Sequence, residues 1–286
     1  MTGGSERKLV DAVPTPKIEL DGVAQDFSLH GNTLPVLRGV DLRVHDGEFV
    51  SIIGPSGCGK STLLNLIAGL EEPSLGRILV DGRQVSRRLG TVGYMHQKDL
   101  LLPWRSVLDN AVLGPELMGK QRSQARTSAL ALMEPFGLEG FERSYPAQLS
   151  GGMRQRVAFL RTVLADQEVI LLDEPFGALD ALTRVGMQEW LLGLWESWSK
   201  TVVLVTHDVE EAVLLSDRVY VFTPRPGTVK AAFAIDLPRP RRYEMVTDAA
   251  FVEIKARALA ALREDEAPAG AGGAATSAVL RTEVSQ

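Results

Sequence analysis

The sequence lacks the features that would place the protein outside a reducing, aqueous compartment. It has one cysteine in 286 residues, so no intramolecular disulfide can form. It has no run of about 18 apolar residues, and residues 1–16 carry no apolar stretch of the kind found in signal peptides. We therefore expect a soluble cytoplasmic protein, for which any membrane role depends on a partner.

The sequence also has no concentration of positive charge. The formal net charge is −5 and no long basic run occurs, so we expect no nucleic-acid partner. With 45% hydrophobic residues, the chain is long enough for a full α/β domain and a smaller second one. Residues 1–15 are small, polar and proline-bearing, and residues 266–286 are of low complexity, so we expect disorder at both ends.

The chain is organised around residues 54–62, which join an apolar, strand-like run at 49–53 to a helix-like segment at 63–68. Glycines in such a turn let several backbone N–H groups approach a triphosphate, and the helix N-terminus adds a favourable dipole. Lys60 can then reach the outer phosphates, and the Ser61 hydroxyl can ligate Mg²⁺. The alternative is a glycine turn before a core helix with a solvated lysine. The predicted nucleotide-binding residues are Gly54, Pro55, Ser56, Gly57, Cys58, Gly59, Lys60, Ser61 and Thr62.

The nucleotide base needs an aromatic partner, for which the sequence offers one candidate. Residues 17–23 and 36–44 alternate apolar and polar side chains on either side of a turn at Gly31-Asn32, which predicts half-exposed antiparallel strands. Phe27 lies in this region, and no other aromatic residue precedes Phe49. Phe27 either stacks on adenine or is a core residue at a strand end.

A helical insertion is predicted between two strands of the α/β core. From Gln97 to about Ala165 the chain is rich in Ala, Leu, Arg and Met, and Ser106 with Asp109 forms an acidic variant of a capping pattern. At the entrance, residues 100–104 form a proline-broken apolar cluster that is neither a strand nor a regular helix. This cluster either packs inside the insertion or offers a docking surface to another protein.

A second anion-binding device is predicted where a helix starts near residue 151. Ser150 suits the N-cap position, and Gly151 and Gly152 allow close backbone approach at the helix N-terminus. A capped helix with a flexible entry is the alternative. Because the chain has one lysine-bearing phosphate loop, two anion devices suggest that each completes a site on another copy, in a two-fold head-to-tail homodimer.

Two carboxylates follow the buried strand predicted at residues 169–172. Ligands of α/β sheets bind beyond the carboxyl ends of the strands, so Asp173 should lie beside the phosphate loop and hold Mg²⁺. Glu174 should point to the other side, with Pro175 keeping it extended. A carboxylate there can orient and deprotonate the water that attacks the γ-phosphate. The alternative is an acidic strand end in solvent.

Residues 54–62, the octapeptide at 149–156 and residues 169–175 together resemble the nucleotide-binding subunit of an ATP-binding cassette (ABC) transporter. The resemblance implies an α/β fold: a P-loop NTPase core of mostly parallel sheet, an antiparallel β subdomain and an all-helical ABC subdomain. It also implies that two such subunits sandwich two ATP molecules. The residues implied on the opposing side of each ATP are Ser150, Gly151, Gly152 and Gln155.

The same resemblance implies further roles. His207, after the strand predicted at 201–206, falls where the family's switch histidine contacts the γ-phosphate and the attacking water. Gln97 resembles the Q-loop glutamine, which reaches the metal and the water. Residues 177–180 resemble the D-loop that crosses to the other subunit, although Gly177 stands where Ser is more usual. The implied catalytic residues are Glu174, His207 and Gln97, and the implied metal ligands are Ser61, Gln97 and Asp173.

The domain organisation expected from this resemblance has three parts between disordered ends. The C-terminal part contains one amphipathic helix, predicted at 247–263. The plausible members of its apolar face are Phe251, Ile254, Leu259 and Leu262. The three parts are an ATPase core at 16–97 and 166–236, a helical subdomain at 98–165 and a C-terminal extension at 237–265.

Residues 100–105 and 237–241 look like the branch of the family that imports nitrate, aliphatic sulfonates, taurine and thiamine-precursor pyrimidines. This implies an ATP-hydrolysing importer subunit, peripheral on the cytoplasmic face of the membrane. Its partners would be integral membrane permease subunits and, through them, an extracytoplasmic solute-binding protein. The alternative is a soluble ABC ATPase with a scaffold or assembly role.

Overall fold

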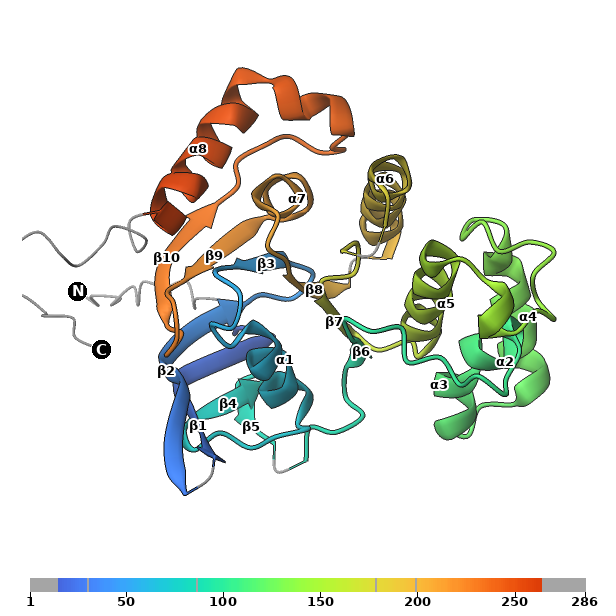
Figure 1. The fold of residues 1–286 in the computed structure, drawn as a ribbon, viewed down its shortest axis with the longest axis horizontal. Helices are drawn as coiled ribbons and strands as arrows, with labels where there is room; N and C mark the ends of the chain where they lie inside the picture. The colour runs from blue at the N-terminus through green and yellow to red at the C-terminus, as the bar shows by residue number, and fades with distance from the viewer. Residues whose placement is uncertain (1–14, 30, 86, 178, 199, 264–286) are drawn as a thin grey trace, which may run out of the picture.

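The computed structural model describes residues 15–263, apart from positions 30, 86, 178 and 199. Except for Thr15, the ends that we expect to be disordered lie outside the described residues. Figure 1 shows a body that contains both β-sheets and, to one side of it, a group of short helices. None of the helices in the described part of the chain is long and apolar enough to cross a membrane.

A six-stranded sheet forms the centre of the body. Its order is β10-β9-β3-β8-β7-β6, and neighbouring strands run parallel except for β10, which pairs antiparallel with β9. This is the mostly parallel core that the sequence predicts. The strands are β3 (Phe49–Ile53), β6 (Gly93–Met95), β7 (Val169–Asp173), β8 (Thr201–Val205), β9 (Arg218–Phe222) and β10 (Val229–Ala234).

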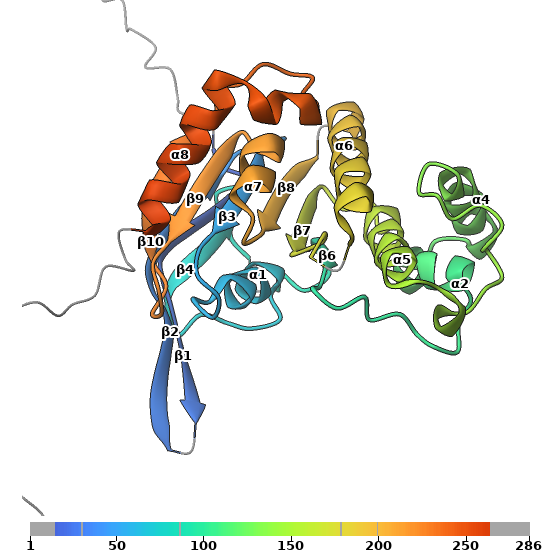
Figure 2. The same ribbon diagram turned by 45° about the horizontal axis from the view of Figure 1, so that its top comes forward.

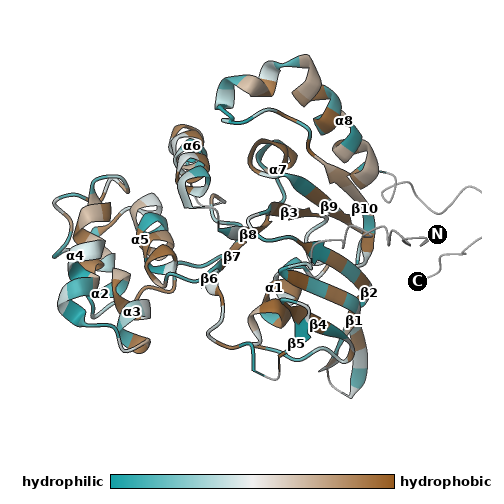
Figure 3. Ribbon diagram, turned by 180° about the vertical axis from the view of Figure 1, so that it is seen from behind, coloured by the Kyte–Doolittle hydropathy of each residue, from teal (hydrophilic) through white to brown (hydrophobic). Residues whose placement is uncertain are grey.

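The central strands of this sheet are covered on both faces, as parallel strands usually are. Every residue of β3, β7 and β8 is buried. Successive side chains point to opposite faces, so Ile170 and Leu172 join one buried cluster while Val169 and Leu171 join the other. In Figure 3 the strands at the centre of the sheet carry the brown of hydrophobic residues.

A four-stranded antiparallel sheet, in the order β2-β1-β4-β5, packs beside this core. Its first two strands, β1 (Ile18–Leu29) and β2 (Asn32–Val44), form a long hairpin that projects from the body in Figure 2. The sheet is completed by β4 (Leu75–Val80) and β5 (Arg83–Gln84). The predicted antiparallel pair is confirmed, and both strands are longer than predicted.

Helix α1 (Lys60–Ala68) packs between the two sheets and fixes one end of the loop at 54–59. Its residues Leu63, Leu64 and Ile67 are buried. They belong to the same cluster as buried side chains of β1 and β2 and as Val50 and Ile52 of β3. The loop therefore begins and ends on close-packed apolar side chains, which limit its movement.

Between β6 and β7 the chain forms the helices that the sequence predicts for this segment. Ser106 caps the first of them by accepting a hydrogen bond from the Asp109 N–H at 3.2 Å, as the capping pattern predicts. Leu100 and Trp104 are 52% and 72% exposed, whereas Leu101 packs against the core. The helices are α2 (Val107–Ala111), α3 (Leu113–Leu117), α4 (Arg122–Met133) and α5 (Gly151–Leu164), with a short 3₁₀ turn η1 (Pro146–Gln148) before α5.

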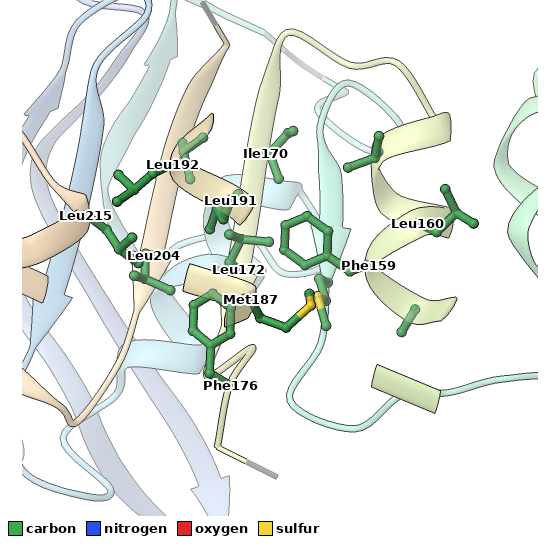
Figure 4. Close-up of a cluster of buried hydrophobic side chains, with 14 of the residues drawn as sticks. Phe159, Leu160, Ile170, Leu172, Phe176, Met187, Leu191, Leu192, Leu204 and Leu215 are labelled. Atoms are coloured by element: carbon green, nitrogen blue, oxygen red, sulfur yellow. The ribbon is translucent and has the colours of Figure 1, made fainter. Parts of the chain in front are cut away.

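Helix α5 is the link between these helices and the sheet. Figure 4 shows Phe159 of α5 beside Leu172 of β7 and Met187 of α6 (Ala181–Trp198), all in one buried cluster. The ring of Phe159 also lies 5.3 Å from that of Trp190, centroid to centroid. Packing against β7 and α6 therefore sets the position of α5 and of the predicted anion device at its N-terminus.

The C-terminal part of the described chain covers the helix that follows β8. After β10 come residues 235–242, the 3₁₀ turn η2 (Tyr243–Thr247) and α8 (Ala249–Arg263). Helix α8 lies over α7 (Val209–Leu215) in Figure 1 and packs against it. The structure confirms the predicted amphipathic helix. Its apolar face packs against the core through Phe251, Ile254, Leu259 and Leu262.

Candidate nucleotide site

The loop between β3 and α1 has the backbone of an anion cradle. Gly57 and Gly59 have φ values of 76° and 108°, which L side chains rarely adopt. A Cβ at Gly54 would lie 3.0 Å from the Cβ of Phe222, so a larger residue there would push the loop away from β9. Burial raises the pKa of the Cys58 thiol, so this cysteine contributes a small protonated side chain.

Lys60 is buried at the start of α1, and its ammonium group lies over the loop. Its Nζ donates to the carbonyl oxygens of Gly54 at 2.8 Å and Pro55 at 3.0 Å. Both acceptors are neutral, so the positive charge is available to an anion held by the loop.

The loop opens into a cavity of about 560 Å³. Its walls come from segments far apart in the sequence, because β3, β8, β7 and β6 are parallel neighbours whose carboxyl ends meet at one edge of the sheet. The structure thus brings Gln97, Glu174 and His207 to the phosphate loop. The lining residues are Val36, Ser56, Gly57, Gly59, Lys60, Ser61, Thr62, Gln97, Glu174, His207 and Arg225.

Asp173 ends β7 beside the phosphate loop, and its side chain forms a hydrogen bond with Ser61. Burial raises the pKa of Asp173, and the charge of Glu174 acts in the same direction. A hydroxyl and a carboxylate are the oxygen ligands that Mg²⁺ takes together with phosphates. Within residues 15–263, omitting the four undescribed positions, no group of three or more His, Cys, Asp or Glu could hold a metal ion.

Glu174 lies between the two other predicted catalytic side chains. Gln97 Nε2 donates to its Oε2 at 2.9 Å, and Nδ1 of His207 lies 3.4 Å from its Oε1. The side chain of Glu174 is 21% exposed and that of His207 is 61% exposed. The carboxylate is therefore held by one hydrogen bond, lies beside the imidazole and lines the cavity.

The backbone of Glu174 differs from the sequence prediction. The prediction that Pro175 keeps Glu174 extended is wrong, because φ of Glu174 is 47°, in the left-handed region. Its N–H donates to the carbonyl of Val205 at 2.8 Å, and its own carbonyl accepts from the N–H of Gly177 at 3.2 Å. A tight turn therefore directs the carboxylate. Such strain costs about 1–3 kcal/mol and is typical of functional sites.

The segment that carries His207 is locked by buried polar contacts. Thr206 Oγ1 accepts from the N–H of Asp208 at 3.0 Å and donates to Oε2 of Glu211 at 3.1 Å. Asp208 in turn caps α7. Glu211 is 5% exposed; burial is the main cause that raises its pKa to about 8, and the charge of Asp208 adds to the effect. His207 thus lies between the end of β8 and a capped helix.

The segment after Gln97 is tied to α5 by two arginines. Arg161 donates to the carbonyl oxygens of Asp99 at 2.7 Å and Leu100 at 2.8 Å. Arg154 donates to Oδ2 of Asp99 at 3.1 Å. Arg154 belongs to the octapeptide at the start of α5, so this motif is bonded directly to the segment that leads out of the cavity.

The predicted second anion device lies elsewhere in the subunit. Ser150 caps α5 by accepting from the N–H of Met153 at 3.2 Å, as predicted. Ser150 and Gly152 line a separate cavity of about 370 Å³ together with Asp180 of the D-loop-like segment, in which residue 178 is not described. Of the described residues, those that line the phosphate-loop cavity include none of the octapeptide. One subunit alone does not bring the two devices together.

Two other predicted nucleotide contacts also lie away from the cavity. The side chain of Gln155 is buried, and its Nε2 donates to the carbonyl of Pro175 at 2.9 Å, so it reaches the turn that carries Glu174. Phe27 pairs with Leu34 near the end of the β1–β2 hairpin, where it is half-buried against the core. Neither residue is among those that line the cavity in the described structure.

Sequence reasoning missed Val36, Arg225 and Glu211. Val36 reaches the cavity because β2 passes beside Gly59. Arg225 reaches it because the turn between β9 and β10 is hydrogen-bonded to β2 through the backbone of Gly227. These contacts are long-range, so no local motif marks them. For Glu211 the available signal was the acidic pair at 210–211, which begins three residues after His207.

The fold and the site define a nucleoside triphosphatase of the phosphate-loop class. The family model described as ABC transporter matches residues 37–177. The chain is 41% identical over 242 residues to an aliphatic sulfonates import ATP-binding protein of Bacillus cereus, a match that covers 85% of this chain and 94% of that protein. It is 46% identical over 218 residues to a formylaminopyrimidine import ATP-binding protein of Halalkalibacterium halodurans, covering 76% and 84%. The chain belongs to the ATP-binding proteins of ABC transporters.

Solved structures agree with this assignment. The dimeric ABC transporter cassette MJ0796 matches with a TM-score of 0.70 at 33% identity, covering 77% of this chain and all of that one. The same cassette in a dimeric post-hydrolysis state, bound to ADP and phosphate, matches with a TM-score of 0.69. The predicted fold class and the predicted ATPase activity are therefore confirmed.

Glu211→Gln should change how the stability of the fold depends on pH. Glu211 is protonated in the folded state up to about pH 8 but ionises near pH 4.5 when unfolded. Between these values the unfolded state binds fewer protons, so the wild-type free energy of unfolding should fall with rising pH relative to that of the variant. Below pH 4.5 and above pH 8 the difference should be constant.

Urea unfolding of both proteins from pH 4 to pH 9 measures this difference. The exposed Glu253→Gln is the matched control, because it removes a carboxyl group from the surface. Parallel stability curves for the wild type and Glu211→Gln would show that Glu211 is ionised in the folded protein.

Proposed function

We propose that this protein is the ATP-hydrolysing subunit of an ABC importer and drives uptake of a small solute through partner permease subunits. The observation that carries the proposal is the cavity in which the phosphate loop meets Gln97, Glu174 and His207. By their names, the two relatives serve import of aliphatic sulfonates and of formylaminopyrimidine. We therefore propose a solute of the nitrate, sulfonate, taurine or thiamine-precursor kind.

In the proposed site, the residues of the phosphate loop bind the phosphates of ATP. The N–H groups at the start of α1 and the ammonium group of Lys60 neutralise the β- and γ-phosphates. Ser61, Asp173 and Gln97 are the proposed ligands of Mg²⁺, which when bound neutralises charge on the phosphate oxygens. Phe27 remains the proposed partner of adenine.

Glu174 is the proposed general base for hydrolysis. A water held by its carboxylate attacks the γ-phosphorus, gives its proton to Glu174 and displaces ADP. Two observations support this role: the amide of Gln97 donates a hydrogen bond that orients the carboxylate before the reaction begins, and His207 lies beside it. His207 is in addition the proposed contact to the γ-phosphate.

The proposed working unit is a head-to-tail homodimer. Ser150, Gly151 and Gly152 of one copy, with Gln155 buried behind them, would close over the ATP held by the phosphate loop of the other. Two observations support this arrangement: the two anion devices line different cavities of one subunit, and the matching cassette is dimeric.

The proposed docking surface for the permease lies around Leu100 and Trp104. Both side chains are exposed, and Leu100 is bonded through its carbonyl to Arg161 of α5. A partner bound there would therefore contact the segment that leads directly to Gln97. Docking on an integral membrane protein would hold this subunit at the cytoplasmic face of the membrane. An extracytoplasmic solute-binding protein would complete the transporter.

Glu174→Gln should lower kcat for ATP hydrolysis by ~10²–10³-fold, because the amide cannot accept the proton of the attacking water. ATP binding should stay near the wild-type level, because the phosphate loop is unchanged. Lys60→Ala should instead weaken binding of ATP itself. Phosphate release and calorimetric titration with ATP measure the two effects, and the exposed Glu134→Gln serves as the control. Wild-type turnover by Glu174→Gln would refute its role as the base.

Co-purification tests the importer assignment. Tagged wild-type protein, expressed in its native host and extracted in mild detergent, should bring down an integral membrane protein. Leu100→Ser/Trp104→Ser should lose this partner and keep ATP binding, because the two exposed apolar side chains lie outside the nucleotide cavity. Val252→Ser, an exposed apolar position on α8, is the control. Recovery of soluble partners alone would favour the scaffold alternative.

A further inference from the structure

The helix that follows His207 is too short to be stable without its neighbours. Helix α7 has seven residues, and isolated helices of this length do not persist in water. Only its N-cap, Asp208, separates it from His207. The direction of the imidazole therefore depends on whatever holds α7 in place.

Arg241 holds the C-terminal end of α7. Its Nη1 donates to the carbonyl oxygens of Val213 and Leu214, each at 3.2 Å, and of Ser216 at 2.6 Å. Val213 and Leu214 are among the last four residues of α7, whose carbonyls have no partner within the helix, and Ser216 is the C-cap. Arg241 is 4% exposed, and burial lowers the pKa of its guanidinium to about 10. A cation at this end of a helix also complements the helix dipole.

Arg239 ties the same end of α7 to α6. It donates to the carbonyl of Leu215 at 3.1 Å and to Oδ1 of Asp217 at 2.7 Å. Its guanidinium lies 4.1 Å from the centre of the Trp195 ring, and its Nη1 is 3.8 Å from Oε1 of Glu196. The helix after the D-loop-like segment and the helix after His207 are thus joined through one side chain.

The N-terminal end of α7 is held by the same part of the chain. Glu210, in the first turn of α7, accepts from Oη of Tyr243 at 3.1 Å and from Nζ of Lys255 at 2.6 Å. Tyr243 belongs to η2 and Lys255 to α8. Residues 237–263, which we call the strap, therefore grip both ends of α7.

We infer that the strap positions His207 for ATP hydrolysis. Helix α1, which follows the phosphate loop and carries Lys60, belongs to a different buried cluster from α7 and α8. Loosening the strap should therefore impair hydrolysis more than nucleotide binding. The inference rests on the proposed role of His207, and Arg239, Arg241, Tyr243 and Lys255 are positioning residues.

Two variants of the full chain loosen the strap at opposite ends of α7. Arg241→Lys keeps the charge but loses the forked donor, and Tyr243→Phe/Lys255→Met removes both contacts to Glu210. Each variant should lower kcat by about tenfold, which is less than the ~10²-fold loss that a 1 Å misplacement of a catalytic group can cause. KM for ATP should change less than about twofold. Arg77→Lys, in an exposed ion pair with Asp21, is the matched control and should match the wild type in both.

A double-mutant cycle with His207→Ala separates positioning from general destabilisation. If the strap acts through His207, its variants should not lower the residual rate of His207→Ala any further. Single-turnover phosphate release resolves such slow rates, and thermal unfolding shows that every variant is folded at the assay temperature.

Three outcomes would overturn the inference. The strap variants could have the wild-type kcat, or their KM for ATP could rise by the same factor by which kcat falls. The third is that they lower kcat by the same factor in the wild type and in His207→Ala. Wild-type kcat in His207→Ala would instead contradict the proposed role of His207. The failure of the strap inference and the failure of the proposed function are therefore distinguishable.

Discussion

The proposed hydrolytic site depends on the position of the Glu174 carboxylate, which accepts a hydrogen bond from the amide of Gln97 and lies beside the imidazole of His207. These three residues follow three neighbouring strands, β6, β7 and β8, so the strand order of the sheet is what brings them together. The left-handed backbone at Glu174 then turns its side chain toward the phosphate loop. Two buried clusters, one on each face of the sheet, hold these strands in place.

Helix α5 connects this centre to the surface proposed to meet a second copy. Its N-terminal residues are capped by Ser150 and line a cavity away from the phosphate loop. From the same helix, Gln155 bonds to the carbonyl after Glu174, and Arg154 bonds to Asp99 after Gln97. A nucleotide that contacts the start of α5 in one copy would therefore also affect the segments of that copy that contain Asp99 and Pro175. Both segments lie next to proposed catalytic residues, Gln97 and Glu174.

Features set by local sequence could be predicted, and features set by distant contacts could not. The phosphate loop, the caps at Ser106 and Ser150 and the apolar face of α8 follow from residues a few positions apart. The turn at Glu174 was mispredicted because it depends on the carbonyl of Val205, on another strand. Arg225 reaches the cavity through the pairing of its turn with β2, and Arg241 finds its acceptors at the end of α7 25 to 28 residues earlier in the chain. Neither contact leaves a periodic signal in the sequence.

The proposed mechanism requires ATP to be held between two copies of this chain. A crystal structure of full-length Glu174→Gln with ATP and Mg²⁺ would show whether it is, because a slow variant keeps its nucleotide. We expect a two-fold dimer with two ATP molecules, each contacted by residues 54–62 of one copy and by Ser150, Gly151 and Gly152 of the other. ATP enclosed within a single copy, with residues 150–152 of every copy turned away from the γ-phosphate, would refute the proposed dimer mechanism.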